Sequence, residues 1–170
     1  MAHRILGLDI GHRAVRLAIV DKTLRQTALA GFDEELVTPV PAAEADGHPK
    51  LPFSAEQCAA VKRLLQRNLR PDDQLAVALP TRLAMHRSLT FPFKDDKAIA
   101  EAVGFELENH IPTPISDQVV DFVRTGEKGG QTEVLAIAAA RDEVEAYLDA
   151  YKYLGVEARH VGLQSLCYAA

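Results

Sequence analysis

Apolar residues at the start of the chain predict two strands joined by a short turn. Residues 5–11 read Ile-Leu-Gly-Leu-Asp-Ile-Gly, which predicts a buried strand ending in an acidic turn. Residues 14–21 predict a second strand that runs back along the first. A third strand is expected over residues 24–37, with a bulge near Gly31. Residues 38–52 are rich in Pro, Ala, Asp and Gly and predict a loop.

A capping box predicts the first helix. Ser54 stands three residues before Gln57, and the helix that follows places Val61, Leu64 and Leu65 on one side. Residues 75–79 are a short continuous apolar run, which indicates a buried strand parallel to the first. The order strand, strand, strand, helix, strand is that of a ribonuclease-H-like half-fold, and actin-like proteins are built from two such halves.

A second unit is expected to begin at about residue 85. It contains a strand over 85–91, a helix from Asp95 or Asp96 to about His110, and two strands joined by the hairpin turn 126–130. A helix over 142–154 follows and ends at Gly155. Residues 157–161 predict a strand that returns to the first unit, and a helix is expected from residue 163. We therefore expect an inserted small α/β subdomain over 85–154 and a ribonuclease-H-like subdomain from 1–84 plus 155–170.

The 170 residues have the composition of a soluble globular protein, with 48% hydrophobic and 25% charged residues. The net charge of −5 argues against a nucleic-acid-binding protein, which usually has a basic face. No apolar run approaches the ~20 residues that cross a bilayer. The chain leads directly into a strand, so no signal peptide is expected. Cys58 and Cys167 lack the spacing of a zinc site and are expected to be thiols in a reducing cytosol.

Several motifs together resemble the PilM family of type IV pilus assembly proteins. Residues 5–11 with Val15 and Arg16 are similar to the opening of that family, Gly-Leu-Asp-Ile-Gly followed by Val-Lys. Residues 77–80 and 87–92 are similar to its next two strands. The most specific motif is 102–112, a Glu-rich helix end that closes on Ile-Pro. The resemblance covers essentially the whole chain and extends to GspL, the related protein of type II secretion.

The resemblance implies an actin-like half-fold with an inserted subdomain of the FtsA/PilM type. It implies a cytoplasmic scaffold that recruits the secretion or pilus assembly ATPase and a bitopic inner-membrane partner of the PilN or GspM kind. The protein would be tethered at the inner membrane through its partners or through a further C-terminal segment. The chain stops as a helix begins, so a fragment is expected, and its exposed sheet edges would favour a homodimer. PilM and GspL both remain open.

The resemblance also implies a phosphate loop at the first turn, formed by Asp9, Gly11, His12, Arg13 and Arg16. PilM-type loops carry small hydroxyl residues where this chain has His12 and Arg13, so the loop is degenerate. Asp9 would either position a magnesium ion through water or bond nearby amides as a turn former. We expect no catalytic residue, no metal site and no ATP binding by this chain, with ATP binding confined to a full-length protein.

The helix near residues 96–110 carries a candidate partner-binding group. At 100° per residue, Phe105 lies about 200° from Val103 and therefore away from the apolar stripe. Glu101 and Glu108 flank it, and an exposed aromatic side chain of this kind often carries binding energy. The alternative is that the helix is covered on two sides.

Two further function classes remain as alternatives to a scaffold. An actin-like ATPase or sugar-kinase-type enzyme needs a second phosphate loop, and this chain has one Asp-x-Gly turn. A ribonuclease-H-type nuclease needs several carboxylates around two metal ions, and the strand over 75–79 carries none. The sequence therefore favours an interaction protein over an enzyme.

Overall fold

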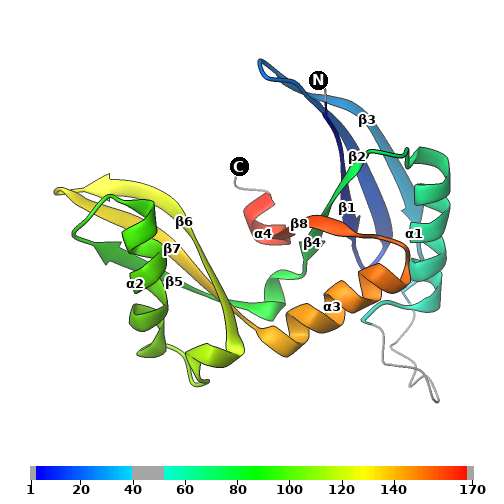
Figure 1. Cartoon of the computed structure of the whole chain (residues 1–170). Coiled ribbons are helices and arrows are strands. Elements are labelled where there is room, and N and C mark those ends of the chain that lie inside the picture. Colours follow the sequence, from blue (N-terminus) through cyan, green and yellow to red (C-terminus); the bar gives the residue numbers. More distant parts are fainter. Residues whose placement is uncertain (1–2, 40–51, 168–170) are drawn as a thin grey trace. The chain divides into compact units, whose positions relative to one another are not determined.

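The computed structural model describes residues 3–39 and 52–167, which divide into two units (Figure 1). The first unit contains Met1–Pro80 and Ala146–Ala170, and the second contains Thr81–Glu145. The predicted insert, 85–154, ends nine residues later than the second unit. The difference arises in α3 (Arg141–Tyr153), whose C-terminal part packs in the first unit. The assignment of the two units as domains stays a prediction.

The first unit is built on a five-stranded mixed sheet in the order β3-β2-β1-β4-β8. Its strands are β1 (His3–Ile10), β2 (Ala14–Lys22), β3 (Thr27–Leu36), β4 (Gln74–Leu79) and β8 (Ala158–Leu163). β1, β2 and β3 are antiparallel neighbours, whereas β4 is parallel to β1 and β8 is parallel to β4. The predicted parallel pairing of the apolar run with the first strand is confirmed.

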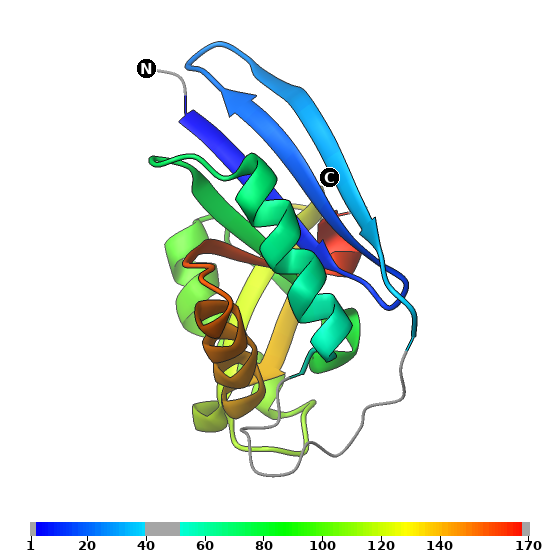
Figure 2. The same cartoon turned by 90° about the vertical axis from the view of Figure 1, so that its right-hand side faces the viewer.

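Helix α1 (Ala55–Asn68) begins at the predicted capping box. The Gln57 amide donates to Ser54 Oγ (3.2 Å), and Gln57 Oε1 accepts from the Ser54 amide (2.7 Å). The helix buries Val61 and Leu64 completely and packs on β2 and β3. Figure 2 shows α1 and α3 in front of the sheet and the short α4 (Gln164–Cys167) behind it.

Side-chain alternation along the strands gives this sheet one core face. Leu6 and Leu8 of β1 point to the α1 face and are almost fully buried. α3 adds Tyr151, whose hydroxyl donates to the Ala78 carbonyl oxygen (3.2 Å) and whose ring lies 5.2 Å from that of Phe53. Burial raises the pKa of the Tyr151 hydroxyl well above its usual value, so this group is neutral and structural.

Strand β3 begins at Thr27, three residues later than predicted. Thr23 and Gln26 close a turn before it, because the Thr23 amide donates to the Gln26 carbonyl oxygen (2.8 Å) and the Gln26 amide donates to Thr23 Oγ1 (3.0 Å). The predicted bulge is confirmed: the register with β2 shifts where Ile19 pairs with Gly31 and Val20 pairs with Leu29.

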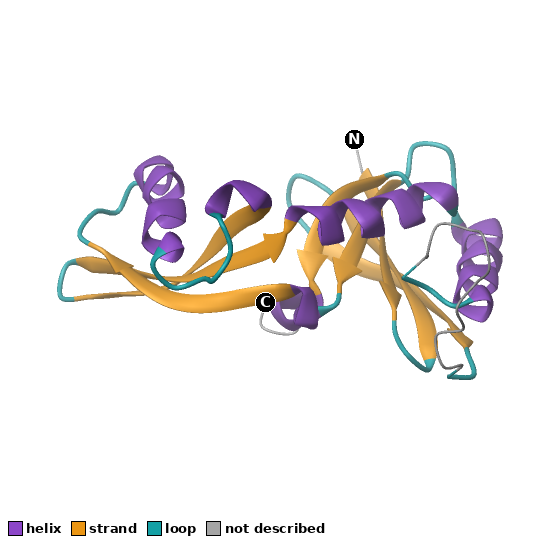
Figure 3. Ribbon diagram, turned by 90° about the horizontal axis from the view of Figure 1, so that it is seen from below, coloured by secondary structure: helices purple, strands orange, loops and turns teal. Residues whose placement is uncertain are grey.

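The second unit packs one helix on a three-stranded antiparallel sheet in the order β5-β7-β6. Its elements are β5 (Ala84–Phe91), α2 (Asp96–Glu108), β6 (Gln118–Lys128), β7 (Gln131–Ala140) and two short 3₁₀ turns, η1 (Thr81–Leu83) and η2 (Ile115–Asp117) (Figure 3). Asp95 caps α2, as its side chain accepts from the Ala98 amide (2.9 Å). The predicted apolar stripe of α2 is confirmed, because Ile99, Val103 and Leu107 are buried.

The hairpin between β6 and β7 is tighter than predicted. Gly129 and Gly130 both have positive φ, 59° and 81°, which gives a two-residue turn of the kind that matches strand twist. Strand β6 therefore continues to Lys128, where the sequence predicted a turn from residue 126. The register shift at Thr125, between Arg124 and Gly126, absorbs one extra residue on the way.

Candidate functional site

A turn of three residues, 11–13, joins β1 to β2 at one end of the five-stranded sheet. The amide of Gly11 donates to the carbonyl oxygen of Ala14 (2.9 Å), and the carbonyl oxygen of Gly11 accepts from Gln57 Nε2 of α1 (2.8 Å). A Cβ atom on Gly11 would lie 3.0 Å from the Ala14 oxygen. The packing of the turn itself therefore favours glycine, and both backbone polar groups of Gly11 are bonded within the chain.

Asp9 binds an amide from the far end of the chain. Its Oδ1 accepts a hydrogen bond of 2.6 Å from Nε2 of Gln164, the first residue of α4. Because β1, β4 and β8 are parallel, their carboxyl ends meet at one edge of the sheet. This edge is where open α/β sheets commonly bind ligands. In the described chain, the Asp9 carboxylate joins the start of α4 to β1.

The other predicted phosphate contacts lie close by but are used differently. His12 and Arg13 are exposed in the turn. Arg16 lies opposite Asp9 in the β1–β2 register, and its Nε donates to Glu34 Oε2 on β3 (2.8 Å). The structure therefore brings all five predicted residues to this end of the sheet. Arg16 Nε is bonded to a carboxylate, and its Nη1 would lie 3.9 Å from a Cβ atom on Gly11.

The fit of this turn to a phosphate group is poor. An anion-binding nest needs successive free amides, commonly beside a residue with positive φ. Among the described residues, positive φ occurs at Asp72, Gly129, Gly130 and Gly155, so it does not occur in this turn. The groups positioned to meet an anion are the bulky side chains of His12 and Arg13. Within residues 3–39 and 52–167, no three His, Cys, Asp or Glu side chains gather as metal ligands.

The outer face of α2 is the second candidate site. Phe105 exposes 74% of its surface, and Glu101 and Glu108 beside it are exposed. The predicted outward orientation of Phe105 is confirmed. Gly104 faces η2, where a Cβ atom would lie 3.7 Å from Ile115 Cγ1. The sheet therefore covers the apolar stripe of α2, and η2 covers the helix beside Gly104. Phe105 takes part in neither contact. Its role as a partner anchor stays a prediction.

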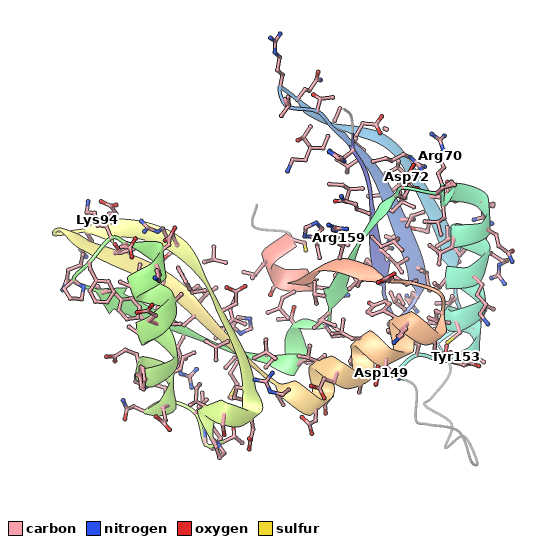
Figure 4. The ribbon with its side chains drawn as sticks, in the orientation of Figure 1. Arg70, Asp72, Lys94, Asp149, Tyr153 and Arg159 are labelled. Atoms are coloured by element: carbon pink, nitrogen blue, oxygen red, sulfur yellow. The ribbon has the colours of Figure 1, made fainter. Side chains whose placement is uncertain are left out.

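The charges at the two ends of α2 are arranged differently. At the first turn, Arg124 Nε donates to Asp96 (2.6 Å), and Lys94, just before the helix, forms an ion pair with Glu127 (Figure 4). The last turn has no basic residue, although it carries Glu108. Among the ion pairs of the described residues, none involves Glu101 or Glu108. Carboxylates near a helix C-terminus are unfavourable by about 0.3–1 kcal/mol, so Glu108 does not favour the helix through its dipole.

Sequence analysis missed two residues at the first site. Gln57 was assigned to the capping box alone, yet its Nε2 also binds Gly11. Gln164 was not singled out, although it opens the helix that follows β8. The available signal was positional: residues after parallel strands of one sheet meet at a single edge.

The comparisons with known proteins identify the family of the chain. Residues 7–170 match the family model described as type IV pilus assembly protein PilM. The chain belongs to the PilM family. No curated protein matches the sequence.

Two solved structures show how far the likeness to the PilM and GspL group extends. A PilM–PilN type IV pilus biogenesis complex is 27% identical, with a TM-score of 0.67 over 95% of this chain and 47% of that chain. The cytoplasmic domain of EpsL, an inner membrane component of the type II secretion system of Vibrio cholerae, is 13% identical, with a TM-score of 0.53 over 96% and 57%. The second likeness shows the fold alone, which is the predicted actin-like α/β fold. The chain spans about half the length of these relatives.

A membrane-spanning helix is not found in the described part of the chain, since none of its helices is both long and apolar enough to cross a bilayer.

Proposed function

We propose that this PilM-family chain is a scaffold at the cytoplasmic face of the inner membrane. It binds the cytoplasmic segment of a bitopic membrane protein and recruits the ATPase of the same machine. Membership of a type IV pilus assembly family supports the proposal, as does a 27% identical relative that was solved as a PilM–PilN complex. The recruiting role extends beyond what those names state.

The observation that carries the proposal is the outer face of α2. Phe105 is 74% exposed on a well-formed helix whose buried stripe is complete without it. Large exposed aromatic side chains are frequent anchors of protein interfaces. Glu101 and Glu108 add negative charge on both sides, so the segment that docks here is expected to carry an apolar anchor site flanked by Lys or Arg.

The test is co-purification with the bitopic partner and with the ATPase, each assayed separately. Phe105→Ala is expected to weaken at least one of these complexes about tenfold or more, equal to about 1.4 kcal/mol. Tyr153→Ala is the matched control, because Tyr153 is an aromatic residue with a similar exposure, 69%, in the first unit. Unchanged binding of both partners by Phe105→Ala would remove α2 from the proposal.

We further propose that this chain catalyses no reaction and does not depend on ATP. The bonded Gly11 backbone and the absence of positive φ in this turn support this view, because an anion-binding nest is built from successive free amides. Titration calorimetry with Mg-ATP is expected to give no binding at a Kd of ~10 μM or tighter, about −7 kcal/mol. Binding in that range would contradict the proposal and favour the ATPase alternative.

A further inference from the structure

The two edges of the five-stranded sheet differ in how they are protected. β8, at one edge, is a six-residue strand. It presents exposed Arg159 (Figure 4), and the next residue, His160, is exposed as well. β3, at the other edge, is a ten-residue strand with no charged side chain over residues 27–32. Short length and charge are the usual means of preventing strand addition at an edge. β8 is short and charged. β3 is longer, and its first six residues carry no charge.

Exposed apolar side chains concentrate on and beside β3. Leu24 is 99% exposed, Leu29 69%, Phe32 60% and Leu36 75%. The β2–β3 register pairs Leu29 with Val20, Phe32 with Ala18 and Leu36 with Ala14, which places all three β3 side chains on one face of the sheet. Clustered exposure of this kind indicates an interaction surface.

That face is opposite the one on which α1 packs. Asp33 and Glu35 alternate with Phe32 and Leu36 along the strand and form ion pairs with Arg67 of α1 at 3.2 and 2.6 Å. On the other face, the main contacts of α4 are with β4 and β8, away from β3. Within the described residues, the apolar face of β3 therefore has no helix packed on it.

We propose that β3 pairs with β3 of a second copy of this chain, antiparallel, about a two-fold axis at Phe32. Ala30 is the bulged residue of each strand, because the register with β2 passes from Leu29 to Gly31. In this register Ala30 of each copy is left unpaired as the bulged residue. Phe32 then lies opposite Phe32 of the second copy, and Asp33 lies opposite Gly31. Beyond the bulge, Glu34 lies opposite Leu29, and Leu36 lies opposite Thr27. Every pair then joins side chains of the same face.

The charges of β3 favour this self-pairing. In the antiparallel register, each of Asp33, Glu34 and Glu35 lies opposite an uncharged residue of the second copy, whereas a parallel register would set these carboxylates beside one another. The antiparallel register therefore avoids repulsion between the carboxylates of the two copies, as an isologous two-fold contact requires.

The oligomeric state of the purified chain tests the pairing. We expect sedimentation velocity to show a dimer whose population rises with concentration over a hundredfold range. Phe32→Lys and Phe32→Glu each place two like charges at the axis, so each variant is expected to raise the dimer dissociation constant at least tenfold. Phe32 is exposed, so both variants are expected to keep the thermal midpoint of the monomer.

A mixture of the two variants distinguishes the proposed axis from other interfaces. Phe32→Lys and Phe32→Glu mixed in equal amounts are expected to form a heterodimer, because opposite charges then meet at the axis. Tyr153→Lys, a charged variant at an aromatic residue of similar exposure (69%) on α3, is the control and is expected to leave the dimer intact. A monomeric wild type, a dimer insensitive to Phe32→Lys, or no recovery in the mixture would overturn the proposal. A monomer that binds a different protein through β3 would also overturn the proposal.

Discussion

Helices α1 and α2, one on each sheet, use their outer faces in different ways. On α1, Arg63 and Arg67 are bound to Asp33 and Glu35 of β3, so the polar face of the helix holds its own sheet in place. On α2, Phe105 and its neighbouring glutamates have no such partner in the described chain. The difference shows that the charges on the outer face of α1 are paired within the fold, whereas Glu101 and Glu108 on α2 are exposed and form no ion pair with the described residues.

The largest expected effect comes from a substitution in the core of the second unit, beneath α2. Leu107 is fully buried against the three-stranded sheet, so Leu107→Ala is expected to cost the second unit about 2–5 kcal/mol. Hydrogen exchange read by mass spectrometry would then show faster exchange in peptides of 84–140 and unchanged exchange in β1 and α1. Equal acceleration in both units would mean that the two helices support one cooperative structure.

A smaller change separates stability from binding on α2. Glu108→Lys places a cation near the helix C-terminus, which is expected to stabilise the helix by about 0.3–1 kcal/mol. The same substitution removes a carboxylate beside Phe105, so partner binding is expected to weaken. Thermal unfolding and co-purification on one protein sample measure the two effects. Loss of stability in this variant would show that Glu108 has a structural partner.

The smallest expected effect concerns the ion pairs of α1. The hydrogen bonds of Asn68 and then Arg67 lower the pKa of Asp33, and those of Arg67 and then Arg63 lower the pKa of Glu35. Since both values are depressed in the folded state, their stabilisation is present above the unfolded value of about 4 and is lost as pH falls through the folded value.

Thermal midpoints between pH 6 and pH 2 are therefore expected to fall less for Arg67→Gln than for the wild type. Both carboxylates are still partly open to solvent, with 29% and 19% of their side-chain surfaces exposed, so the difference is expected to be small. An identical fall in both proteins would show that these ion pairs do not contribute to the stability of the fold. Arg25→Gln is a suitable control, because Arg25 is an exposed cation in the β2–β3 turn.

Much of the local structure could be predicted because its causes are local. The capping box of α1 and the period of Ile99, Val103 and Leu107 need only neighbouring residues to be recognised. The same reasoning predicted the direction of Phe105. The length of the β6–β7 turn could not be predicted, because a glycine-rich segment permits turns of several lengths. In the structure Gly129 and Gly130 both have positive φ, and the turn is two residues long.

The candidate sites were only partly predictable. The sequence identified Asp9 and Gly11 by their motif, but the bonds that occupy them come from Gln164 and Gln57, which lie far away along the chain. The role of Arg16 as a phosphate contact stays a prediction, but the motif did not show that strand register places Arg16 Nε against Glu34. Contacts of this kind depend on which strands become neighbours, and no local pattern encodes that choice.

By itself, the sequence determined the order of strands and helices, the likeness to the PilM family and the outward position of Phe105, because periodicity and motif are properties of neighbouring residues. Only the tertiary structure decided that β3 is an edge strand with Leu29, Phe32 and Leu36 on a face without a helix. An alternating strand shows which residues share a face, but whether that face is covered depends on packing between distant segments.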